Sequence, residues 1–253
     1  MKIKERQNQI LAILRAMQRI VMIDELSKIL HVSQVTIRRD LQDLENEKAI
    51  IRTHGGCMHA GRIAMETEYH KKVALNFNLK QAIGKRAAKE VREGEVILVD
   101  DGSTTFHLST HLNHFRSLYI YTNSFALIPE LKRFPGVVLN ILGGIVDPDR
   151  YSVSGYLTEQ VIERIRFDKV FLGVDAIDDS GRCFVKSESI ARLAQIMLRS
   201  GKEKILLSDH TKVGQDAYFS YGSLDDFDKW ITTPGTHKKQ MDLYKKMTQI
   251  IIA

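Results

Sequence analysis

Apolar residues recur at helical spacing in two short stretches near the N-terminus. The spacing of four of them predicts a short amphipathic helix over 24–30: Ile23, Leu26, Ile29 and Leu30. Asp24 is placed to cap the first turn of that helix, and the chain turns at 31–32. Ser33 is then placed to cap a second helix from Gln34 to about Glu47. Two short helices joined by a tight turn are typical of a helix-turn-helix DNA reader.

The second helix has an apolar face and a polar face. At about 100° per residue, Ile37, Leu41 and Leu44 fall together and predict a buried stripe. The opposite face offers a cation, an amide and methyl groups, which are the groups that read base edges in the major groove. The alternative is a basic face that only contacts solvent. We predict DNA contacts from the cap and the outward side of this helix, namely Ser33, Gln34, Val35, Thr36, Arg38, Arg39 and Gln42.

A short β-prone stretch follows the second helix. Residues 49–52 are predicted to form a strand and residues 54–56 a turn, which together indicate a small hairpin. Two helices followed by a hairpin are typical of a winged helix-turn-helix. Arg52 and His54 would lie on the wing, where a basic side chain can contact phosphate or enter the minor groove.

The sequence VSQVTIRRDLQDLENEKAIIRTHGG resembles the N-terminal signature of the DeoR family of bacterial transcription regulators. We therefore expect residues 1–57 to form a DNA-binding domain. Residues 58–79 are polar, basic and weakly periodic, and we interpret them as a linker. Residues 80–253 would form a second domain that senses an effector and makes the protein oligomeric.

From residue 80 onwards, apolar strands alternate with amphipathic helices. Strands are predicted at seven places: 95–100, 118–122, 137–142, 169–174, 204–208, 230–232 and 248–252. This alternation predicts an α/β domain with a mostly parallel sheet and helices on both faces. In such a sheet the ligand lies beyond the carboxyl ends of the strands.

The loops after these strands carry candidate ligand-binding groups. Gly102 and the hydroxyl residues Ser103, Thr104 and Thr105 stand at a predicted helix start, which suits a phosphate, although such a run is also found in simply capped helices. Lys212 is placed to neutralise an anion. Three glycines serve either the ligand or only their turns: Gly143, Gly144 and Gly155.

The loops DDGSTT, TNS, LGG, VSG, GVDAID and DHTK, in this order, resemble those of the DeoR-family effector domain. That domain is similar to ribose-5-phosphate isomerase, and the resemblance implies a phosphorylated sugar or sugar derivative as the effector. It assigns the phosphate to Gly102–Thr105 and the sugar to Asp100, Asn123, Asp175 and Lys212. This chain departs from the family at Asp101, where members carry a small residue, and at Lys186, which is either an extra anion contact or the solvated start of a helix.

Charge is divided unevenly along the chain. Residues 1–92 carry 18 Lys and Arg against 10 Asp and Glu, a net charge of +8, whereas residues 93–253 have a net charge of −2. The positive end is the end that attraction to backbone phosphates requires. Two cysteines make neither a disulfide framework nor a zinc site. Residues 1–10 have no apolar stretch that could be a signal peptide, and the sequence has no apolar run of about 18 residues, so we expect neither a signal peptide nor a membrane span. We expect a cytoplasmic protein without a metal or cofactor.

Three functions fit these patterns. The first is a repressor of a carbohydrate catabolic operon that binds double-stranded operator DNA as a homodimer or tetramer and is released by a phosphorylated sugar. The second is a sugar-phosphate isomerase-like enzyme with an added DNA-binding head. The resemblance argues against it, because the stretch 191–195 has no carboxylate where the isomerases carry their base. The third is a structural DNA binder, which would not need the glycine and hydroxyl loops.

Overall fold

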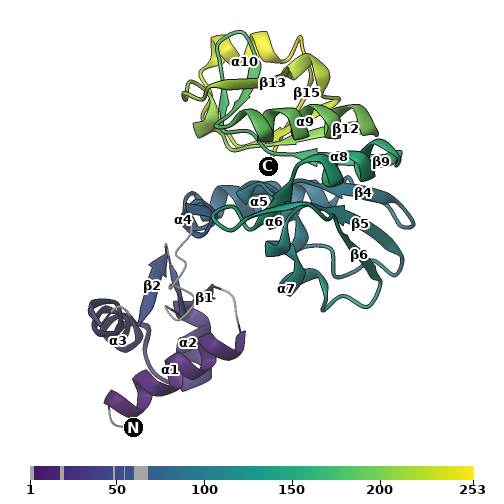
Figure 1. Ribbon diagram of the computed structural model, residues 1–253. Helices are drawn as coiled ribbons and strands as arrows, with labels where there is room; N and C mark the ends of the chain where they lie inside the picture. The colour runs from purple at the N-terminus through teal and green to yellow at the C-terminus, as the bar shows by residue number, and fades with distance from the viewer. Residues whose placement is uncertain (1–2, 18–19, 48, 54, 60–67) are drawn as a thin grey trace. The chain divides into compact units, whose positions relative to one another are not determined.

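The computed structural model describes residues 3–17, 20–47, 49–53, 55–59 and 68–253 (Figure 1). These residues form two compact units, Met1–Leu75 and Asn76–Ala253, each of which has its own core. His54, which the sequence places on the wing, lies outside the described residues.

The first unit is a winged helix-turn-helix. Its elements in chain order are α1 (Ile3–Met17), β1 (Val21–Met22), α2 (Ile23–Leu30), α3 (Gln34–Asn46), β2 (Ile50–Thr53), β3 (Gly56–His59) and α4 (Glu68–Ala74). The three strands form an antiparallel sheet in the order β1-β3-β2. Ile10 and Leu14 of α1 pack with Leu26 of α2 and Leu41 of α3 in one apolar cluster. This packing fixes α3 against the other two helices.

Helix α3 begins at Gln34 as predicted and ends one residue early, whereas α2 differs at its start. This helix begins at Ile23, one residue early, and its N-cap is Met22, which makes no side-chain cap. Asp24 therefore lies inside the first turn, where its charge still favours the helix N-terminus, but the prediction that it caps the helix is wrong. His31 ends α2 with a φ of 53° and so makes the tight turn to α3.

The second unit is built on a seven-stranded parallel sheet. Its strands are β4 (Val96–Val99), β5 (Leu118–Thr122), β6 (Val137–Ile141), β9 (Phe167–Leu172), β12 (Gly201–Leu207), β14 (Lys229–Thr232) and β15 (Gln249–Ile252). They are arranged in the order β15-β14-β12-β9-β4-β5-β6. Each strand pair runs parallel, as the alternation of strands and helices predicts.

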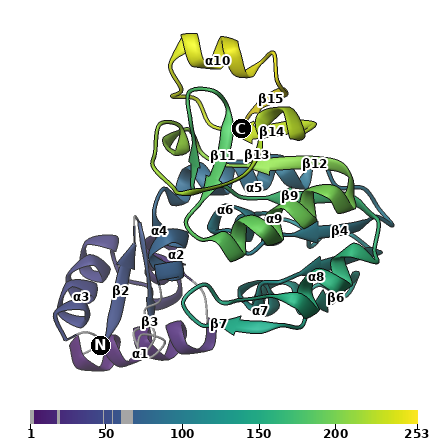
Figure 2. The ribbon, with the colours of Figure 1, turned by 45° about the horizontal axis from the view of Figure 1, so that its top comes forward.

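Helices cover both faces of this sheet. The helices are α5 (Phe77–Ala88), α6 (Ser103–Ser109), α7 (Ile128–Leu131), α8 (Tyr156–Glu163), α9 (Glu188–Ser200) and α10 (Lys238–Tyr244). Ile97 and Val99 of β4 belong to the cluster that contains Ile83 of α5, whereas Leu98 between them belongs to the cluster that contains Ala194 of α9. Side chains alternate between the two faces along a strand, so each face has its own apolar layer. Figure 2 shows α9 beside β9 and β12.

Five short antiparallel strands were not predicted from the sequence. Strands β7 (Ile145–Asp147) and β8 (Ser152–Ser154) form a hairpin, and β10 (Ala176–Ile177), β11 (Arg182–Val185) and β13 (Phe219–Ser223) form a small sheet. Two to five residues are too few to show a period, so no strand was predicted in these stretches. The segment 58–79, interpreted as a linker, also holds the end of β3, all of α4 and the start of α5.

Candidate functional site

Helix α3 exposes the side chains that the sequence assigns to DNA. Ile37, Leu41 and Leu44 are buried, as predicted. Arg38, Arg39 and Gln42 are exposed, Thr36 is half-buried, and Val35 is 73% exposed. An apolar side chain that is so accessible on a polar helix face is available to contact a thymine methyl group.

Ser33 caps α3 as the sequence predicts. Its Oγ accepts a hydrogen bond from the backbone N–H of Thr36 at 3.2 Å, and the two hydroxyl oxygens lie 2.9 Å apart. Gln34, the first residue of α3, is exposed. A capped first turn holds the N-terminal residues of the helix in a fixed geometry, and those residues contact bases in helix-turn-helix proteins.

The wing contacts the recognition helix through Arg52. Its Nη1 donates to Oε1 of Gln42 at 3.1 Å and lies 4.0 Å from Oε2 of Glu45. The structure thus brings together two residues that the sequence assigned to DNA separately. In the protein without DNA, this hydrogen bond uses the side-chain oxygen of Gln42 and one of the N–H donors of Arg52.

A buried ion pair between α1 and α3 was missed by the sequence reasoning. Nη2 of Arg6 donates to Oδ1 of Asp40 at 2.9 Å, and Nε of Arg6 donates to the other carboxylate oxygen. Asp40 is only 1% exposed. Of its two neighbours in the sequence, Arg39 is exposed and Leu41 is buried. The available signal was a carboxylate on the border of the apolar stripe of α3, but its partner lies 34 residues earlier.

In the second unit, the predicted effector residues gather beyond the carboxyl ends of β4, β5, β9 and β12. Asp100 follows β4, Asn123 follows β5, and Asp175 lies three residues after β9. Lys212 ends the short 3₁₀ helix η3 (His210–Lys212) that follows β12. The carboxyl ends of parallel strands meet at one edge of the sheet, which is where α/β proteins bind ligands.

The loop 100–105 is held by its own hydrogen bonds. The hydroxyl of Thr105 donates to the carbonyl oxygens of Asp100 at 2.8 Å and of Gly102 at 2.7 Å, and this residue is fully buried. Oδ2 of Asp100 accepts the N–H of Gly173 at 2.9 Å, which joins the ends of β4 and β9. Thr104 is also buried, whereas Gly102 and Ser103 are half-buried. The accessible part of the predicted phosphate loop is therefore Gly102 and Ser103, while the contacts of Thr105 favour a structural role.

Lys80 adds a buried cation to this loop, a role that the sequence reasoning did not give it. The residue lies in the first turn of α5, it is 2% exposed, and its Nζ donates to Oγ of Ser103 at 3.0 Å. An ammonium group with three donors beside an accessible hydroxyl is well suited to a phosphate oxygen. The available signal was a lysine that shares the apolar face of α5 with Ile83 and Ala87.

Asp101 forms a bidentate ion pair with Arg150 of the β7–β8 hairpin. Nε of Arg150 lies 2.9 Å from Oδ2 of Asp101, and Nη2 lies 3.0 Å from Oδ1. An unpaired carboxylate here would repel an anionic ligand. Asp101 is 4% exposed, and the guanidinium of Arg150 balances its charge.

The pKa values of the neighbouring carboxyl groups of Asp100 and Asp101 are shifted in opposite directions. Burial and the charge of Asp101 raise the pKa of Asp100 well above its usual value. Burial also acts to raise the pKa of Asp101, but the charge of Arg150 and hydrogen bonds from Asp100, Arg150 and Ser152 outweigh it and lower that pKa to about 2. Burial thus favours the neutral form of Asp100, whereas the ion pair with Arg150 favours the charged form of Asp101.

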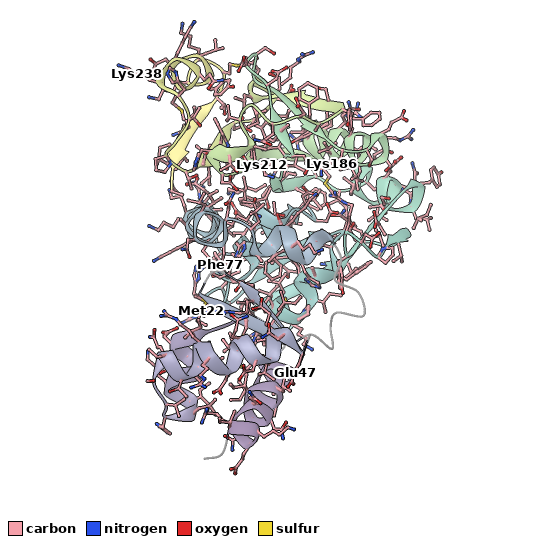
Figure 3. The ribbon with its side chains drawn as sticks, turned by 90° about the vertical axis from the view of Figure 1, so that its left-hand side faces the viewer. Met22, Glu47, Phe77, Lys186, Lys212 and Lys238 are labelled. Carbon is pink, nitrogen blue, oxygen red and sulfur yellow. The ribbon has the colours of Figure 1, made fainter. Side chains whose placement is uncertain are left out.

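The remaining predicted effector residues differ in accessibility. Asn123 is buried, and its Nδ2 donates to the carbonyl oxygen of Val153 at 3.2 Å. Asp175 is half-buried, and its Oδ2 accepts the backbone N–H of Lys186 at 3.2 Å. Lys186 is exposed and Lys212 is half-buried (both labelled in Figure 3). This hydrogen bond joins Asp175 to Lys186, which lies two residues before the start of α9.

The three predicted glycines have different environments. A Cβ on Gly144 would lie 2.3 Å from Oγ1 of Thr158 and 2.5 Å from the carbonyl oxygen of Ser154, so this glycine allows a close approach. Gly155 has a φ of +95°, which a side chain would strain. A Cβ on Gly143 would meet nothing within 4 Å. Packing and backbone geometry therefore account for Gly144 and Gly155 but not for Gly143.

The carboxylate of Asp178 is engaged in a turn. Its Oδ1 accepts the N–H groups of Ser180 and Arg182, and Nε of Arg182 donates to Oδ2 at 2.8 Å. A carboxylate held in this way is poorly placed to act as the base of an isomerase. Within the described residues, the structure contains neither a cluster of His, Cys, Asp and Glu side chains that could hold a metal nor a helix that is long and apolar enough to cross a membrane.

Both parts of the chain match models of known protein families. Residues 6–60 match the DeoR-like helix-turn-helix domain, and residues 75–233 match the DeoR C terminal sensor domain. The HTH-type transcriptional regulator GlpR of Haloferax volcanii is 32% identical over 210 residues, which cover 83% of this chain and 82% of that protein. The HTH-type transcriptional repressor GlcR of Bacillus subtilis is 29% identical over 209 residues, which cover 83% of this chain and 80% of that protein.

Among solved structures, the ribose 5-phosphate isomerase from Plasmodium falciparum is 16% identical, and the match covers 54% of this chain and 52% of that chain with a TM-score of 0.39. The curated relatives are named as regulators of transcription and not as enzymes. The resemblance on which the sequence reasoning rested is therefore confirmed over both units, and so is the combination of a winged helix-turn-helix with an α/β domain. The chain belongs to the DeoR family of HTH-type transcriptional regulators.

Proposed function

We propose that this regulator represses a carbohydrate catabolic operon and is released from its operator by a phosphorylated sugar or sugar derivative. The observation that carries the effector proposal is the contact between the buried ammonium of Lys80 and the hydroxyl of Ser103. It places a cation and accessible hydrogen-bond donors at the carboxyl edge of a parallel sheet, where α/β proteins bind ligands. GlcR, which is named as a repressor, supports the direction of control.

The DNA-binding surface of the proposal is the exposed side of α3 together with the wing. The residues that we assign to DNA are Ser33, Gln34, Val35, Thr36, Arg38, Arg39 and Gln42 on α3 and its cap, with Arg52 on β2. The hydrogen bond between Arg52 and Gln42 gives Arg52 a second role, because it also orients the amide of Gln42. The N-terminal excess of positive charge supports attraction to phosphates by the same unit.

The effector side of the proposal retains the residues at the carboxyl edge and adds Lys80. Gly102, Ser103 and Lys80 would contact the phosphate, and Asp175 and Lys212 are accessible enough to contact the sugar. Four other predicted residues would support the pocket without contacting the effector, because they are buried or hydrogen-bonded to the protein backbone: Asp100, Thr104, Thr105 and Asn123.

The coupling between the sites is proposed to depend on an oligomer. Symmetric DNA readers bind two half-sites, so a homodimer or tetramer would present two copies of α3. An effector changes operator affinity only if it binds one arrangement of the DNA-binding units more tightly than another.

The test is operator binding with and without effector. Bound fragments are first selected from genomic DNA and mapped by footprinting. We expect protected sites upstream of genes for carbohydrate use, and release of the DNA when one member of a panel of sugar phosphates is added. Unchanged operator affinity across a broad panel would contradict the effector proposal, and footprints that lie elsewhere would contradict the assigned target.

A further inference from the structure

We propose that Arg150, oriented by Asp101, is a specificity-determining residue that binds a second oxyanion of the effector, so that the preferred effector carries an acidic group in addition to its phosphate. This inference rests on the proposed function, because it adds a second anion contact to the same site. It is carried by the geometry of one ion pair and by the elements that hold it.

The ion pair uses one edge of the guanidinium. Nε and Nη2 of Arg150 each donate to one carboxylate oxygen of Asp101, at 2.9 and 3.0 Å. A guanidinium has five N–H donors in one plane, so this pairing uses two of them and leaves the edge that carries Nη1. Among the contacts of the described residues, Nη1 makes no hydrogen bond, and the Arg150 side chain is 24% exposed. One edge is thus fixed in the protein and a second pair of donors remains for an oxyanion.

Arg150 is held in place from two directions. Oδ1 of Asp147 accepts the backbone N–H of Asp149 at 3.0 Å and that of Arg150 at 3.1 Å, so the turn between β7 and β8 is fixed. Asp101 then fixes the side chain from the loop after β4. A guanidinium whose backbone and side chain are both held loses little rotational freedom when a ligand binds.

The ion pair lies next to the predicted phosphate loop. Asp101 directly precedes Gly102, and the following residue, Ser103, contacts Lys80. Two cations from different elements, α5 and the β7–β8 hairpin, therefore contact the same loop on either side of Gly102. An effector whose phosphate lies at Lys80 and Ser103 would have Arg150 available for a second group.

The neighbouring carboxyl groups do not rule out an anion here. The charge of Asp101 is balanced by Arg150 itself, and burial raises the pKa of Asp100, which favours its neutral form. Asp175, whose charge also acts on Arg150, accepts the backbone N–H of Lys186. Apart from its partner Asp101, the carboxyl groups whose charges act on Arg150 are Asp100 and Asp175, and both accept a backbone N–H group of the protein.

The experiment compares matched ligands on the full-length protein by titration calorimetry. The probes are glucose 6-phosphate against 6-phosphogluconate, and fructose 6-phosphate against fructose 1,6-bisphosphate; the second member of each pair has one more oxyanion. We expect the second member of at least one pair to bind about tenfold or more tightly, as a charge-assisted pair of hydrogen bonds allows. Arg150→Gln should abolish that preference, and Arg150→Lys, which keeps the charge but not the planar fork, should reduce it.

Arg192→Gln is the matched control. Arg192 makes a similar bidentate pair with the buried carboxylate of Glu159, at 3.0 and 2.9 Å, so the variant also removes a guanidinium from a buried acid. It should keep the ligand preference. If Arg150→Gln lowers the melting temperature but leaves the preference ratio unchanged, the ion pair is structural and the inference is overturned.

Two further outcomes would also overturn it. If neither pair shows a preference in the wild type, or if Arg150→Gln weakens both members of a pair equally, no second anion contact exists at Arg150. In those cases the single-phosphate site of the proposed function survives. If none of the four probes binds, the inference is overturned, whereas the phosphorylated-sugar effector is decided separately by operator binding with the broad panel.

Discussion

Arg6 of α1 is joined to Asp40 of α3 by two hydrogen bonds across the core of the winged helix-turn-helix. The carboxylate is almost completely buried, so among the described residues its charge is compensated by the guanidinium of Arg6. The pair therefore fixes the recognition helix on the side opposite to its exposed residues.

Replacing Arg6 with Met is expected to destabilise the DNA-binding unit by about 3 kcal/mol, because a buried carboxylate is left without its partner. The measurement is hydrogen exchange of the amides in α1, α2 and α3, which separates this unit from the rest of the chain. Combining Arg6→Met with Asp40→Leu removes both charges and should recover most of the lost protection. Equal protection in Arg6→Met and the wild type would show that the pair does not stabilise the unit.

Replacing Arg39 with Ala is expected to remove specific operator binding. One good contact with a base contributes about 1–3 kcal/mol, so the affinity should fall roughly five- to 150-fold. The measurement is a mobility shift with the selected operator and with a scrambled sequence of the same length. Arg199→Ala, an exposed arginine of the second unit, serves as control. Arg39 does not read bases if its variant binds both DNA sequences as the wild type does.

Much of this architecture can be predicted from local pattern, and the rest cannot for a physical reason. The stripe of Ile37, Leu41 and Leu44 and the cap of Ser33 follow from periods and propensities within one helix. The ion pairs of Arg6 with Asp40 and of Arg150 with Asp101 join residues 34 and 49 positions apart, and no short-range pattern records such a pairing.

The effector site shows the same division. The positions of Asp100, Asn123 and Asp175 follow from the rule that strand ends of a parallel sheet share an edge. Lys80 could not be assigned in this way, because a lysine in a helix is usually solvated and only tertiary packing buries this one. The five short antiparallel strands were missed because they are shorter than the window in which alternation becomes visible.

Replacing Lys80 with Met is expected to abolish binding of phosphorylated sugars, because the variant keeps the apolar stem and removes the ammonium that contacts Ser103. The measurement is a thermal shift of the full-length protein with a sugar-phosphate panel. Lys89→Met, at the exposed C-terminal end of the same helix, is the matched control and should keep the shift. Lys212→Ala should weaken release from the operator without abolishing it. A normal shift in Lys80→Met would remove this residue from the site.

The Asp101–Arg150 pair should make stability depend on pH in the acid range. The folded-state pKa of Asp101 is lowered to about 2, against about 3.9 in an unfolded chain, so its contribution is present above pH 4 and is lost as the pH falls towards 2. The loss is roughly 2 kcal/mol. Asp100, whose pKa is raised, acts in the opposite sense and loses its contribution as the pH rises from about 4. Melting temperatures should therefore fall less between pH 4 and pH 2 in the double variant Asp101→Asn with Arg150→Gln than in the wild type.

Gly143 and Gly144 offer a test of which glycine serves the fold and which serves a ligand. Gly144→Ala should lower the melting temperature clearly, because its Cβ would lie 2.3 Å from Oγ1 of Thr158 and 2.5 Å from a backbone oxygen that cannot move freely. Gly143→Ala should leave the melting temperature nearly unchanged, because open space surrounds the new methyl group. If Gly143 borders the effector, its alanine variant should nevertheless bind sugar phosphates more weakly. Normal ligand binding by a stable Gly143→Ala protein would show that this residue only connects β6 to the hairpin.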